Sequence, residues 1–313
     1  MSKGALKVGL LVGRERSFPD ALIAEVNARN TGVIAEYTKL DGTRMAEPCP
    51  YRVLVDRISH DVTCYQPYLK NAVLSETVVI NNPFWRIADD KFFGTSLVTK
   101  LGINCPKTVV LPSKSYPPDV TPESLSNLTY PMDWEAIIGY TGLPAILKPH
   151  WGGGWKHIYR VNSLEELIYF YDQTGPLCMI LQEFIEWQQY MRCLCIGKEK
   201  VLPTAWDPRR PHFERYRTDY PPLDPALEQR VIEEAIRINQ ALGYDMNTVE
   251  FAIRDGVPYA IDFMNSAPDF DISSLGPVYF EWVVKAMADL VIARALGEDP
   301  SPPEYRWDAF LKT

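Results

Sequence analysis

The hydrophobic pattern at the start of the chain predicts strands alternating with a helix. Residues 6–12 form an apolar run that ends at a glycine, which is typical of a buried strand. Residues 19–29 carry apolar side chains at helical spacing, and short apolar runs at 51–55 and 77–81 indicate two further strands. Strand, helix and strand in this order predict an α/β layer with a parallel sheet.

The remainder of the chain predicts helices and strands in a mixed order. Ser163 begins a capping box, and Asp224-Pro225 begins a helix that stops at Gly243. Asp255-Gly256 marks a hairpin turn. The predicted helices are 83–101, 163–171, 225–242 and 276–296, the strands are 144–148, 179–184, 191–196, 248–254 and 258–263, and a loop rich in proline and serine covers 111–130.

Composition indicates a folded protein of two or three domains. The 313 residues are 46% hydrophobic and 23% charged, which argues against wholesale disorder. Lys and Arg number 32 against 40 Asp and Glu, which gives a net charge of −8. No basic run is interleaved with aromatic residues, so we expect no nucleic-acid partner.

Neither membrane segments nor metal-binding cysteines are predicted. No apolar run approaches the roughly 20 residues that a membrane span requires, and the start of the chain lacks the layout of a signal peptide. The six cysteines show no zinc spacing, so we expect them to be reduced. These features predict a cytoplasmic protein with no membrane partner.

The first candidate for chemistry is Lys148 with the glycines that follow it. Lys148 ends a predicted strand, and Gly152, Gly153 and Gly154 follow after three intervening residues. Glycines allow backbone N–H groups to approach an anion closely, and the lysine supplies positive charge. The pattern favours a phosphate-binding loop, with an ordinary flexible turn as the alternative.

The second candidate is a group of oxygen ligands near the C-terminus. Glu250 lies in the first strand of the predicted hairpin, Asp262 lies in the second, and Asn265 follows closely. Two carboxylates and an amide oxygen on facing strands suit Mg²⁺. The alternative is a solvated hairpin face, but Asp262 interrupts an apolar run and therefore needs a partner.

Together these elements resemble the ATP-grasp superfamily, and within it the enzymes similar to glutathione synthetase and to the ribosomal-protein glutamate ligases. The resemblance covers residues 80–295 and rests on motifs in one order: Asn81-Asn82-Pro83, Asp90-Lys91, Gly102-Ile103, Pro106-Lys107-Thr108, Leu147-Lys148-Pro149, the glycine loop, Gln182-Glu183-Phe184-Ile185, Arg192, Glu250 and Asp262 to Asn265. It implies an ATP-grasp fold that is α+β in its ATP-binding part and that follows an N-terminal α/β domain. The implied domains are 1–100, 101–186 and 187–313.

The resemblance also implies roles for single residues. Lys91, Lys148 and the loop Gly152-Gly153-Gly154 would hold the ATP phosphates, and Arg192 would face the γ-phosphate. Glu183, Phe184 and Ile185 would form the adenine hinge, and Glu250, Asp262 and Asn265 would bind magnesium, with two ions expected.

Three departures from the family pattern affect these roles. Tyr190 stands where the family has a carboxylate for the ribose. The metal motif Asp262-Phe263-Met264-Asn265 is one residue longer than Glu-x-Asn, so either a bulge realigns Asn265 or the site uses Asp262 differently. Residues 206–217, which correspond to the acceptor-binding region of the glutamate ligases, lack the Gly-Gly of those enzymes and carry arginines instead. Arg209 and Arg217 are candidates for binding a carboxylate or the phosphate formed on it.

The implied reaction is ADP-forming ligation of a carboxylate to an amine through an acyl phosphate. An amino acid or a peptide is the substrate class that the resemblance implies, and a homodimer is one alternative for the assembly. A phosphotransferase and a non-catalytic ATP-binding regulator are the alternative functions. Arg14, Arg16, Arg57 and His60 follow N-terminal strands at the sheet end where ligands bind, and are further candidate substrate contacts.

Overall fold

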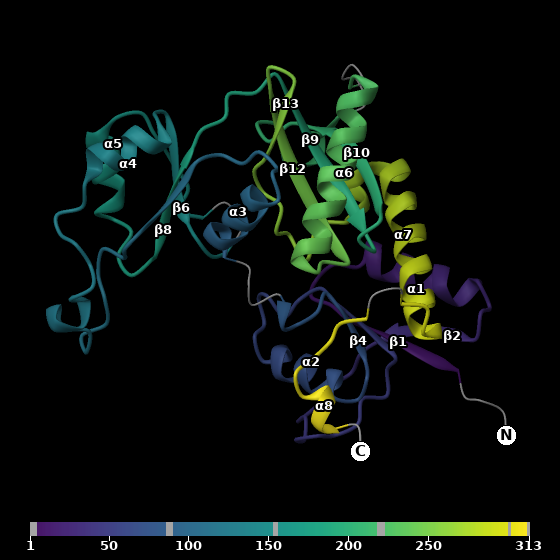
Figure 1. Ribbon diagram of the computed structural model, residues 1–313. Coiled ribbons are helices and arrows are strands. Elements are labelled where there is room, and N and C mark those ends of the chain that lie inside the picture. The colour runs from purple at the N-terminus through teal and green to yellow at the C-terminus, as the bar shows by residue number, and fades with distance from the viewer. Residues whose placement is uncertain (1–4, 86–89, 153–155, 218–222, 300–301, 312–313) are drawn as a thin grey trace. The chain divides into compact units, whose positions relative to one another are not determined.

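The computed structural model describes residues 5–85, 90–152, 156–217, 223–299 and 302–311 (Figure 1). The chain divides into two compact units. One consists of residues 1–83 with 269–313, and the other of residues 84–268. Within the described residues, no helix has both the length and the apolar character needed to cross a membrane.

The first unit is an α/β layer around a parallel sheet. Its strands are β1 (Leu6–Leu11), β2 (Val33–Tyr37), β3 (Val53–Asp56) and β4 (Val78–Ile80), paired in the order β2-β1-β3-β4. All three pairings are parallel. Its helices are α1 (Ser17–Ala28), α2 (Tyr65–Val73), α7 (Ile272–Leu296) and α8 (Asp308–Leu311). The α/β layer that the N-terminal pattern predicts is therefore confirmed.

Helix α7 returns the end of the chain to this first unit. It packs against α1, and Arg29 Nη1, in the residue that follows α1, lies 2.5 Å from Asp289 Oδ1 of α7. The helix begins earlier than residue 276, because Asp271 caps it by accepting from the N–H of Ser273, and a kink follows at Gly276, where φ is 69°. The compact units thus place α7 with the N-terminal strands, whereas the implied domains place it with residues 187–313.

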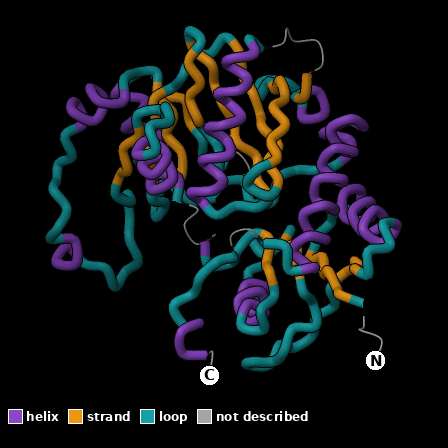
Figure 2. The backbone as a smooth tube through the Cα atoms, turned by 45° about the vertical axis from the view of Figure 1, so that its right-hand side comes forward, coloured by secondary structure: helices purple, strands orange, loops and turns teal. Residues whose placement is uncertain are grey.

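The second unit contains two antiparallel sheets, seen as two groups of strands in Figure 2. The smaller sheet has the order β5-β8-β6-β7, and the larger has the order β11-β10-β9-β12-β13. The strands of the smaller sheet are β5 (Thr108–Leu111), β6 (Ala145–Pro149), β7 (Tyr159–Val161) and β8 (Met179–Glu183), beside helices α4 (Trp134–Thr141) and α5 (Leu164–Tyr171). The larger comprises β9 (Gln189–Ile196), β10 (Lys200–Trp206), β11 (Tyr216–Arg217), β12 (Met246–Arg254) and β13 (Val257–Ala260), with α3 (Lys91–Lys100) and α6 (Pro225–Leu242).

Alternation along β9 and β12 gives the larger sheet two different faces. Met191, Cys193 and Val249 join the apolar core with Val231 and Ile238 of α6, the helix that lies along the sheet in Figure 1. Because successive side chains of a strand point to opposite faces, Tyr190, Arg192 and Glu250 face away from α6. The six cysteines are free thiols, as expected. The second face of this sheet therefore carries the polar candidates.

Candidate functional site

Lys148 and Lys91 lie beside the glycine loop. Lys148, on β6, is buried and its Nζ donates to Gln182 Oε1 at 2.8 Å. Lys91 is the first residue of α3; its Nζ donates to Gly152 O at 2.5 Å, and its N–H donates to His150 O at 2.9 Å. Lys91 thus contacts the start of the loop, and its charge acts on the buried ammonium group of Lys148. Gly153 and Gly154 lie outside the described residues.

Burial and neighbouring charges act against each other on Lys148. Burial is the main cause that lowers the pKa of its ammonium group, Asp262 raises that pKa, and Lys91 lowers it further. A buried cation near a second cation is unfavourable unless anions accompany it. The pair therefore suits an anionic ligand such as a phosphate.

Residues of the predicted adenine hinge form polar contacts with other parts of the protein. Glu183 Oε1 lies 3.1 Å from Arg254 Nη1, and the N–H of Phe184 donates to Pro144 O at 3.2 Å. Ile185 is buried in an apolar cluster. An adenine contact from this segment would have to use groups other than the N–H of Phe184, and the hinge role stays a prediction.

Arg192 and Glu250 face each other across the β9–β12 pairing. They are register partners, with Arg192 Nε 3.5 Å from Glu250 Oε1. Arg192 Nη2 also donates to Thr248 Oγ1 at 3.2 Å, and the guanidinium carbon lies 5.1 Å from the centre of the Trp206 ring. The arginine is thus held over the sheet by an anion, a hydroxyl and an aromatic face.

Tyr190 has a different partner from the one expected. Its hydroxyl donates to Glu250 Oε2 at 2.6 Å, and its ring packs against Trp187 and Trp206. Burial and the adjacent Glu250 raise the pKa of this phenol well above its usual value, so it stays a donor. The observed bond ties Tyr190 to a candidate metal ligand, and its predicted place beside the ribose is untested.

A β-bulge shapes the candidate metal site. Ile261 N–H donates to Glu250 O at 3.0 Å, whereas Glu250 N–H donates to Asp262 O at 2.8 Å. Two residues of one segment thus oppose a single residue of β12. Of the two alternatives for the lengthened motif, the structure contains a bulge, which consists of Ile261 and Asp262 and precedes Asn265. Further along, Asn265 Nδ2 donates to Thr248 Oγ1 at 3.1 Å.

The donor set fits a hard divalent cation. Burial raises the pKa of the Glu250 carboxyl to about 7, Arg192 opposes this, and the nearby Asp262 raises it again. Two nearby carboxylates, with an amide oxygen close by, match the ligands that Mg²⁺ prefers. Among the described residues, no three His, Cys, Asp or Glu side chains could hold a metal together, so a site of three ligands here needs the amide of Asn265.

The arginine-rich loop after β10 is supported by aromatic rings. Arg209 donates to both carboxylate oxygens of Asp207 at 2.9 Å and stacks on Trp187, with 4.2 Å between guanidinium carbon and ring centre. Arg209 holds the pKa of Asp207 below its usual value. Arg209 is nonetheless 67% exposed and can contact a ligand. The backbone of Arg217 pairs with Ala205, and its side chain lies outside the described residues.

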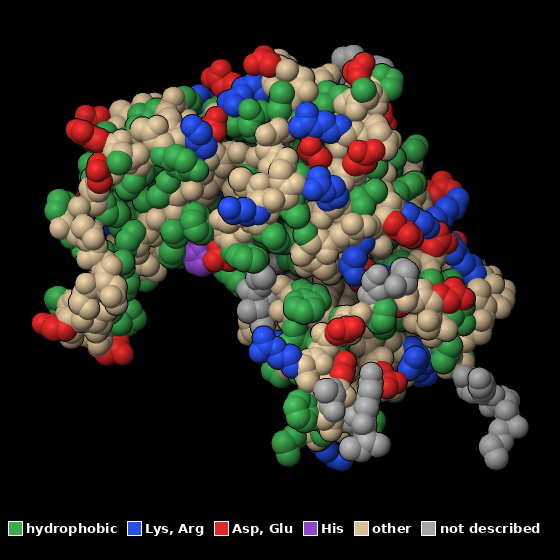
Figure 3. Space-filling view, in the orientation of Figure 1, with side chains coloured by type: hydrophobic (Ala, Val, Ile, Leu, Met, Phe, Trp, Pro, Cys, Tyr) green, Lys and Arg blue, Asp and Glu red, His purple; other side chains and the backbone are tan. Residues whose placement is uncertain are grey.

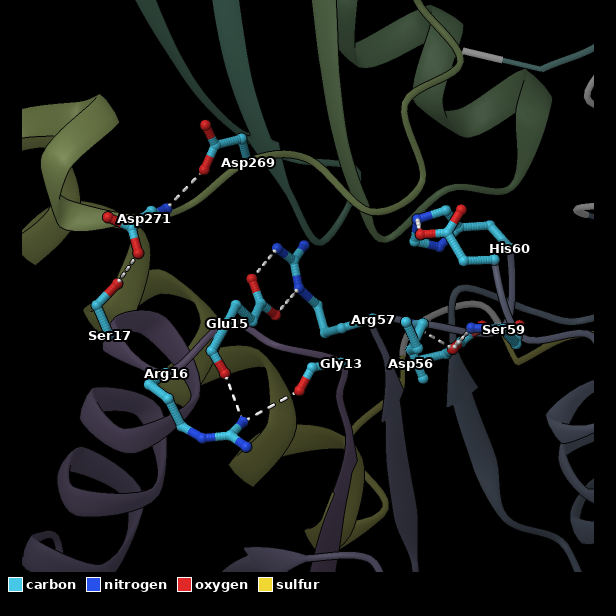
Figure 4. A network of polar contacts seen from close by, with 12 residues as sticks. Gly13, Glu15, Arg16, Ser17, Asp56, Arg57, Ser59, His60, Asp269 and Asp271 are labelled. Atoms are coloured by element: carbon cyan, nitrogen blue, oxygen red, sulfur yellow. Dashed lines mark hydrogen bonds and ion pairs between the residues drawn. The ribbon is translucent and has the colours of Figure 1, made fainter. Parts of the chain in front are cut away.

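The N-terminal candidates make contacts inside the first unit (Figure 4). Arg57 forms a two-pronged ion pair with Glu15, at 2.7 and 2.8 Å, between the rings of Phe18 and Phe270. Arg16 donates to backbone carbonyl oxygens of its own loop. His60 Nε2 lies 3.5 Å from Asp61. The buried Arg57 therefore has a clear structural role, and the substrate contacts of these residues, and of Arg14, stay predictions.

We expect Arg57→Met to destabilise the protein by about 3 kcal/mol, because it leaves Glu15 without the cation it faces in a largely buried pair. Urea denaturation measures this loss. Arg52→Met, at an exposed position of the same unit, is the control and should change stability by less than about 0.5 kcal/mol. Equal stabilities for the two variants would contradict the structural role.

Sequence reasoning missed Gln182, Thr248 and Trp206. Each shares a strand face with a predicted residue or contacts one: Gln182 binds Lys148, Thr248 binds Arg192, and Trp206 lies against Arg192. The signal for Thr248 was its spacing of two residues from Glu250, which places both on one face. Surface charge gave no such signal, since basic and acidic side chains are interspersed on the face shown in Figure 3.

Comparison with known sequences finds D-alanine–D-alanine ligases. The chain is 26% identical over 181 residues to that of Ralstonia nicotianae, which covers 52% of this chain and 54% of the relative. It is 26% identical over 189 residues to that of Polynucleobacter asymbioticus, covering 55% and 56%. The chain thus spans about half the length of the curated relatives it matches. No protein-family model matches the sequence.

Comparison with solved structures covers nearly the whole chain. The D-alanine–D-alanine ligase of Bacillus anthracis, solved with ATP, superposes with a TM-score of 0.65 at 14% identity, over 96% of this chain and 100% of that one. A RimK domain ATP-grasp protein of Sphaerobacter thermophilus gives 0.65 at 19% identity, over 91% and 99%. The ATP-grasp ligase PsnB, solved with a precursor peptide and AMPPNP, gives 0.61 at 13% identity, over 94% and 99%. The predicted resemblance is confirmed: the chain has the fold of the ATP-grasp superfamily.

Proposed function

We propose that this chain is an ATP-dependent ligase that joins a carboxylate to an amine through an acyl phosphate and releases ADP and phosphate. The observation that carries the proposal is the convergence of Lys148 and Arg192 on the carboxylates Glu250 and Asp262. The charges of Asp262 and Glu250 raise the pKa of Lys148. The charges of Arg192 and Lys148 lower the pKa of Glu250. Such a set of neighbouring opposite charges, which comes from strands of both antiparallel sheets and from the segment after β13, suits a metal–phosphate ligand. The named activity of the similar sequences and the ATP-grasp fold support the same reading.

In this proposal the side chains act by positioning and by neutralising charge. Lys91, Lys148 and the loop at Gly152 would hold the phosphates of ATP, and Arg192 would stabilise charge on the transferred phosphoryl group. A carboxylate oxygen of the substrate attacks the γ-phosphorus, and the bond from that phosphorus to the bridging oxygen of ADP breaks. An amine then attacks the acyl carbon, phosphate leaves, and the amine loses a proton to solvent. No protein nucleophile is required.

Glu250, Asp262 and Asn265 are the residues that would hold magnesium. When bound, magnesium would neutralise negative charge on the phosphate groups; the use of two ions is part of the proposal. Trp151, which is 53% exposed and precedes Gly152, would limit access of water to an acyl phosphate.

An amino acid or a short peptide is the proposed carboxylate. The named relatives act on D-alanine, and PsnB was solved with a peptide. Arg209, aligned by Asp207 and Trp187, offers a planar cation that suits a carboxylate, and Arg217 follows on β11. Free thiols and the use of ATP support a cytoplasmic location.

Hydroxylamine trapping tests the reaction class. Hydroxylamine replaces the unknown amine, so a panel of amino acids, short peptides and other carboxylates can be screened with ATP and Mg²⁺. We expect one carboxylate class to give a hydroxamate together with ADP. ADP release that depends on a substrate but gives no hydroxamate would overturn the ligase proposal in favour of a phosphotransferase. ATP binding without turnover across the whole panel would favour a regulator.

A further inference from the structure

Three asparagines form a hydrogen-bonded chain through the apolar core of the second unit. Asn239 of α6 and Asn247 of β12 are both fully buried, and Asn247 Nδ2 donates to Asn239 Oδ1 at 2.9 Å. Asn239 Nδ2 in turn donates to Ala235 O at 2.7 Å. At the other end of this series of hydrogen bonds, Asn247 Oδ1 accepts from the N–H of Asn265 at 2.8 Å. Buried amides among apolar side chains are costly, so fully bonded ones serve to fix a conformation.

The side chain of Asn247 forms two hydrogen bonds with the backbone of the segment that follows the bulge. Besides accepting from the N–H of Asn265, it donates through Nδ2 to Phe263 O at 2.7 Å. A backbone N–H must meet the oxygen of the amide, and a backbone carbonyl must meet its nitrogen. Both partners therefore define the same orientation of the Asn247 side chain. The backbone from 263 to 265 is thus fixed from the adjacent strand.

The side chain of Asn265 is held by the next residue of β12. Asn265 Nδ2 donates to Thr248 Oγ1 at 3.1 Å, and Arg192 Nη2 donates to the same oxygen at 3.2 Å. Thr248 is 1% exposed. With the nitrogen of the Asn265 amide committed to Thr248, its oxygen is the end left to act as a ligand. The hydroxyl also links the candidate metal ligand to the arginine proposed to stabilise the phosphoryl group.

We propose that Asn247 and Thr248 are positioning residues for the metal site, Asn247 by setting the backbone of Asn265 and Thr248 by setting its amide. This rests on the proposed function, in which Asn265 is a magnesium ligand. The lengthened motif explains the need for such a clamp: after the bulge, plain strand pairing no longer dictates where residue 265 lies. Partners that orient metal ligands in this way typically contribute 10–100-fold to metal affinity.

Binding of Mn²⁺ with a non-hydrolysable ATP analogue, followed by electron paramagnetic resonance, tests the role of Asn247. We expect Asn247→Leu to weaken Mn²⁺ binding by about 10–100-fold, similar to Asn265→Ala. Asn239→Leu is the matched control: it breaks the same buried chain but leaves both bonds from Asn247 to the 263–265 segment intact. It should lower the melting temperature as Asn247→Leu does, yet change Mn²⁺ affinity by less than about 3-fold, because the outer partners of the ligand remain.

Equal losses of Mn²⁺ affinity in Asn247→Leu and Asn239→Leu would overturn the role of Asn247, and so would unchanged affinity in Asn247→Leu. Should Asn247→Leu fail to fold, Thr248→Val decides, because it removes one hydroxyl while keeping the shape of the side chain. We expect Thr248→Val to weaken Mn²⁺ binding by about 10-fold, and Thr248→Ser to restore it. Wild-type affinity in Thr248→Val would contradict the proposal.

These outcomes are separable from those of the ligase proposal. Weakened Mn²⁺ binding in the variants, with no hydroxamate from the wild-type protein, would retain the positioning role and reject the ligase. Hydroxamate formation by the wild type, with unchanged Mn²⁺ affinity in Asn247→Leu and Thr248→Val, would retain the ligase and reject the positioning role.

Discussion

Replacing Lys148 by methionine should lower the rate of ADP formation by about 10²–10³-fold, the loss that follows removal of one preorganised group facing developing charge. Lys148 is buried, interacts with the charges of Glu250 and Asp262, and lies near a second cation, Lys91. Methionine keeps the length and apolar stem of the side chain but removes its charge. The measurement is substrate-dependent ADP release with the carboxylate found by hydroxylamine trapping, together with calorimetry of ATP binding.

The same substitution should leave the protein folded. Burial lowers the pKa of the Lys148 ammonium group, which means that the folded state disfavours the charged form. Methionine removes the cost of burying this charge, which stabilises the folded protein. The loss of the hydrogen bond to Gln182 destabilises it. Lys114→Met, which removes an exposed lysine of the same unit, is the control and should retain activity. Normal ADP formation by Lys148→Met would reject the proposed site.

Sequence patterns predicted the elements that have both a clear period and clear ends. Ser163 caps α5 by accepting from the N–H of Glu166 at 3.2 Å, and α6 ends at Gly243 with φ of 74°. Strands β6, β8 and β9 also lie where apolar runs predicted them. Within the helix predicted from residue 83, α3 begins at Lys91, because Asp90 caps it by accepting from Phe92 and Phe93 N–H; residues 86–89 lie outside the described residues. Local signals sufficed where capping chemistry and periodicity agreed.

Strands that depend on distant partners were missed. β10 contains Pro203, and a proline inside an apolar run argues against a central strand. The proline is tolerated because β11 pairs only with Ala205 and Trp206 within the described residues. β7 has three residues and is defined by its pairing with β6. Such strands form because a neighbour binds them, which a local pattern does not encode.

The candidate site was predicted by residue type and motif order, but its connections were not. Lys148, Arg192 and Glu250 were named in advance, and the structure brings their charges together. The bond from Tyr190 to Glu250 joins two strands 60 residues apart in sequence, and the bonds from Asn247 join β12 to the segment beyond the bulge. Register between strands is set by packing across the whole sheet, so these contacts could not be derived from spacing along one strand.

Replacing Glu250 by glutamine should stabilise the metal-free protein at pH 8 and abolish the metal site. Burial raises the pKa of this carboxyl from 4.5 to about 7, so the folded protein binds the proton more tightly than the unfolded chain does. The free energy of unfolding of the wild type therefore falls as the pH rises from about 4.5 to about 7, by up to about 3 kcal/mol, and is flat above that range. Glutamine resembles the protonated form and avoids this loss.

Denaturation in EDTA at pH 5 and pH 8 measures the effect of Glu250→Gln. We expect the variant to exceed the wild type in stability by up to about 3 kcal/mol at pH 8 and by less than about 1 kcal/mol at pH 5. Glu186→Gln, at an exposed position of the same unit, should show no such pH dependence. A variant less stable than the wild type at pH 8 would show that the ion pair with Arg192 outweighs burial.

The response to metal should then reverse the order of the two proteins. A cation that binds only the folded state stabilises it by mass action, and its charge favours the ionised form of the buried Glu250 carboxyl. With Mg²⁺ and a non-hydrolysable ATP analogue, we expect the wild type to gain stability at pH 8 and Glu250→Gln to gain little. A residue that destabilises the empty protein and stabilises the loaded one is retained for binding, not for folding. An equal gain in both proteins would remove Glu250 from the metal site.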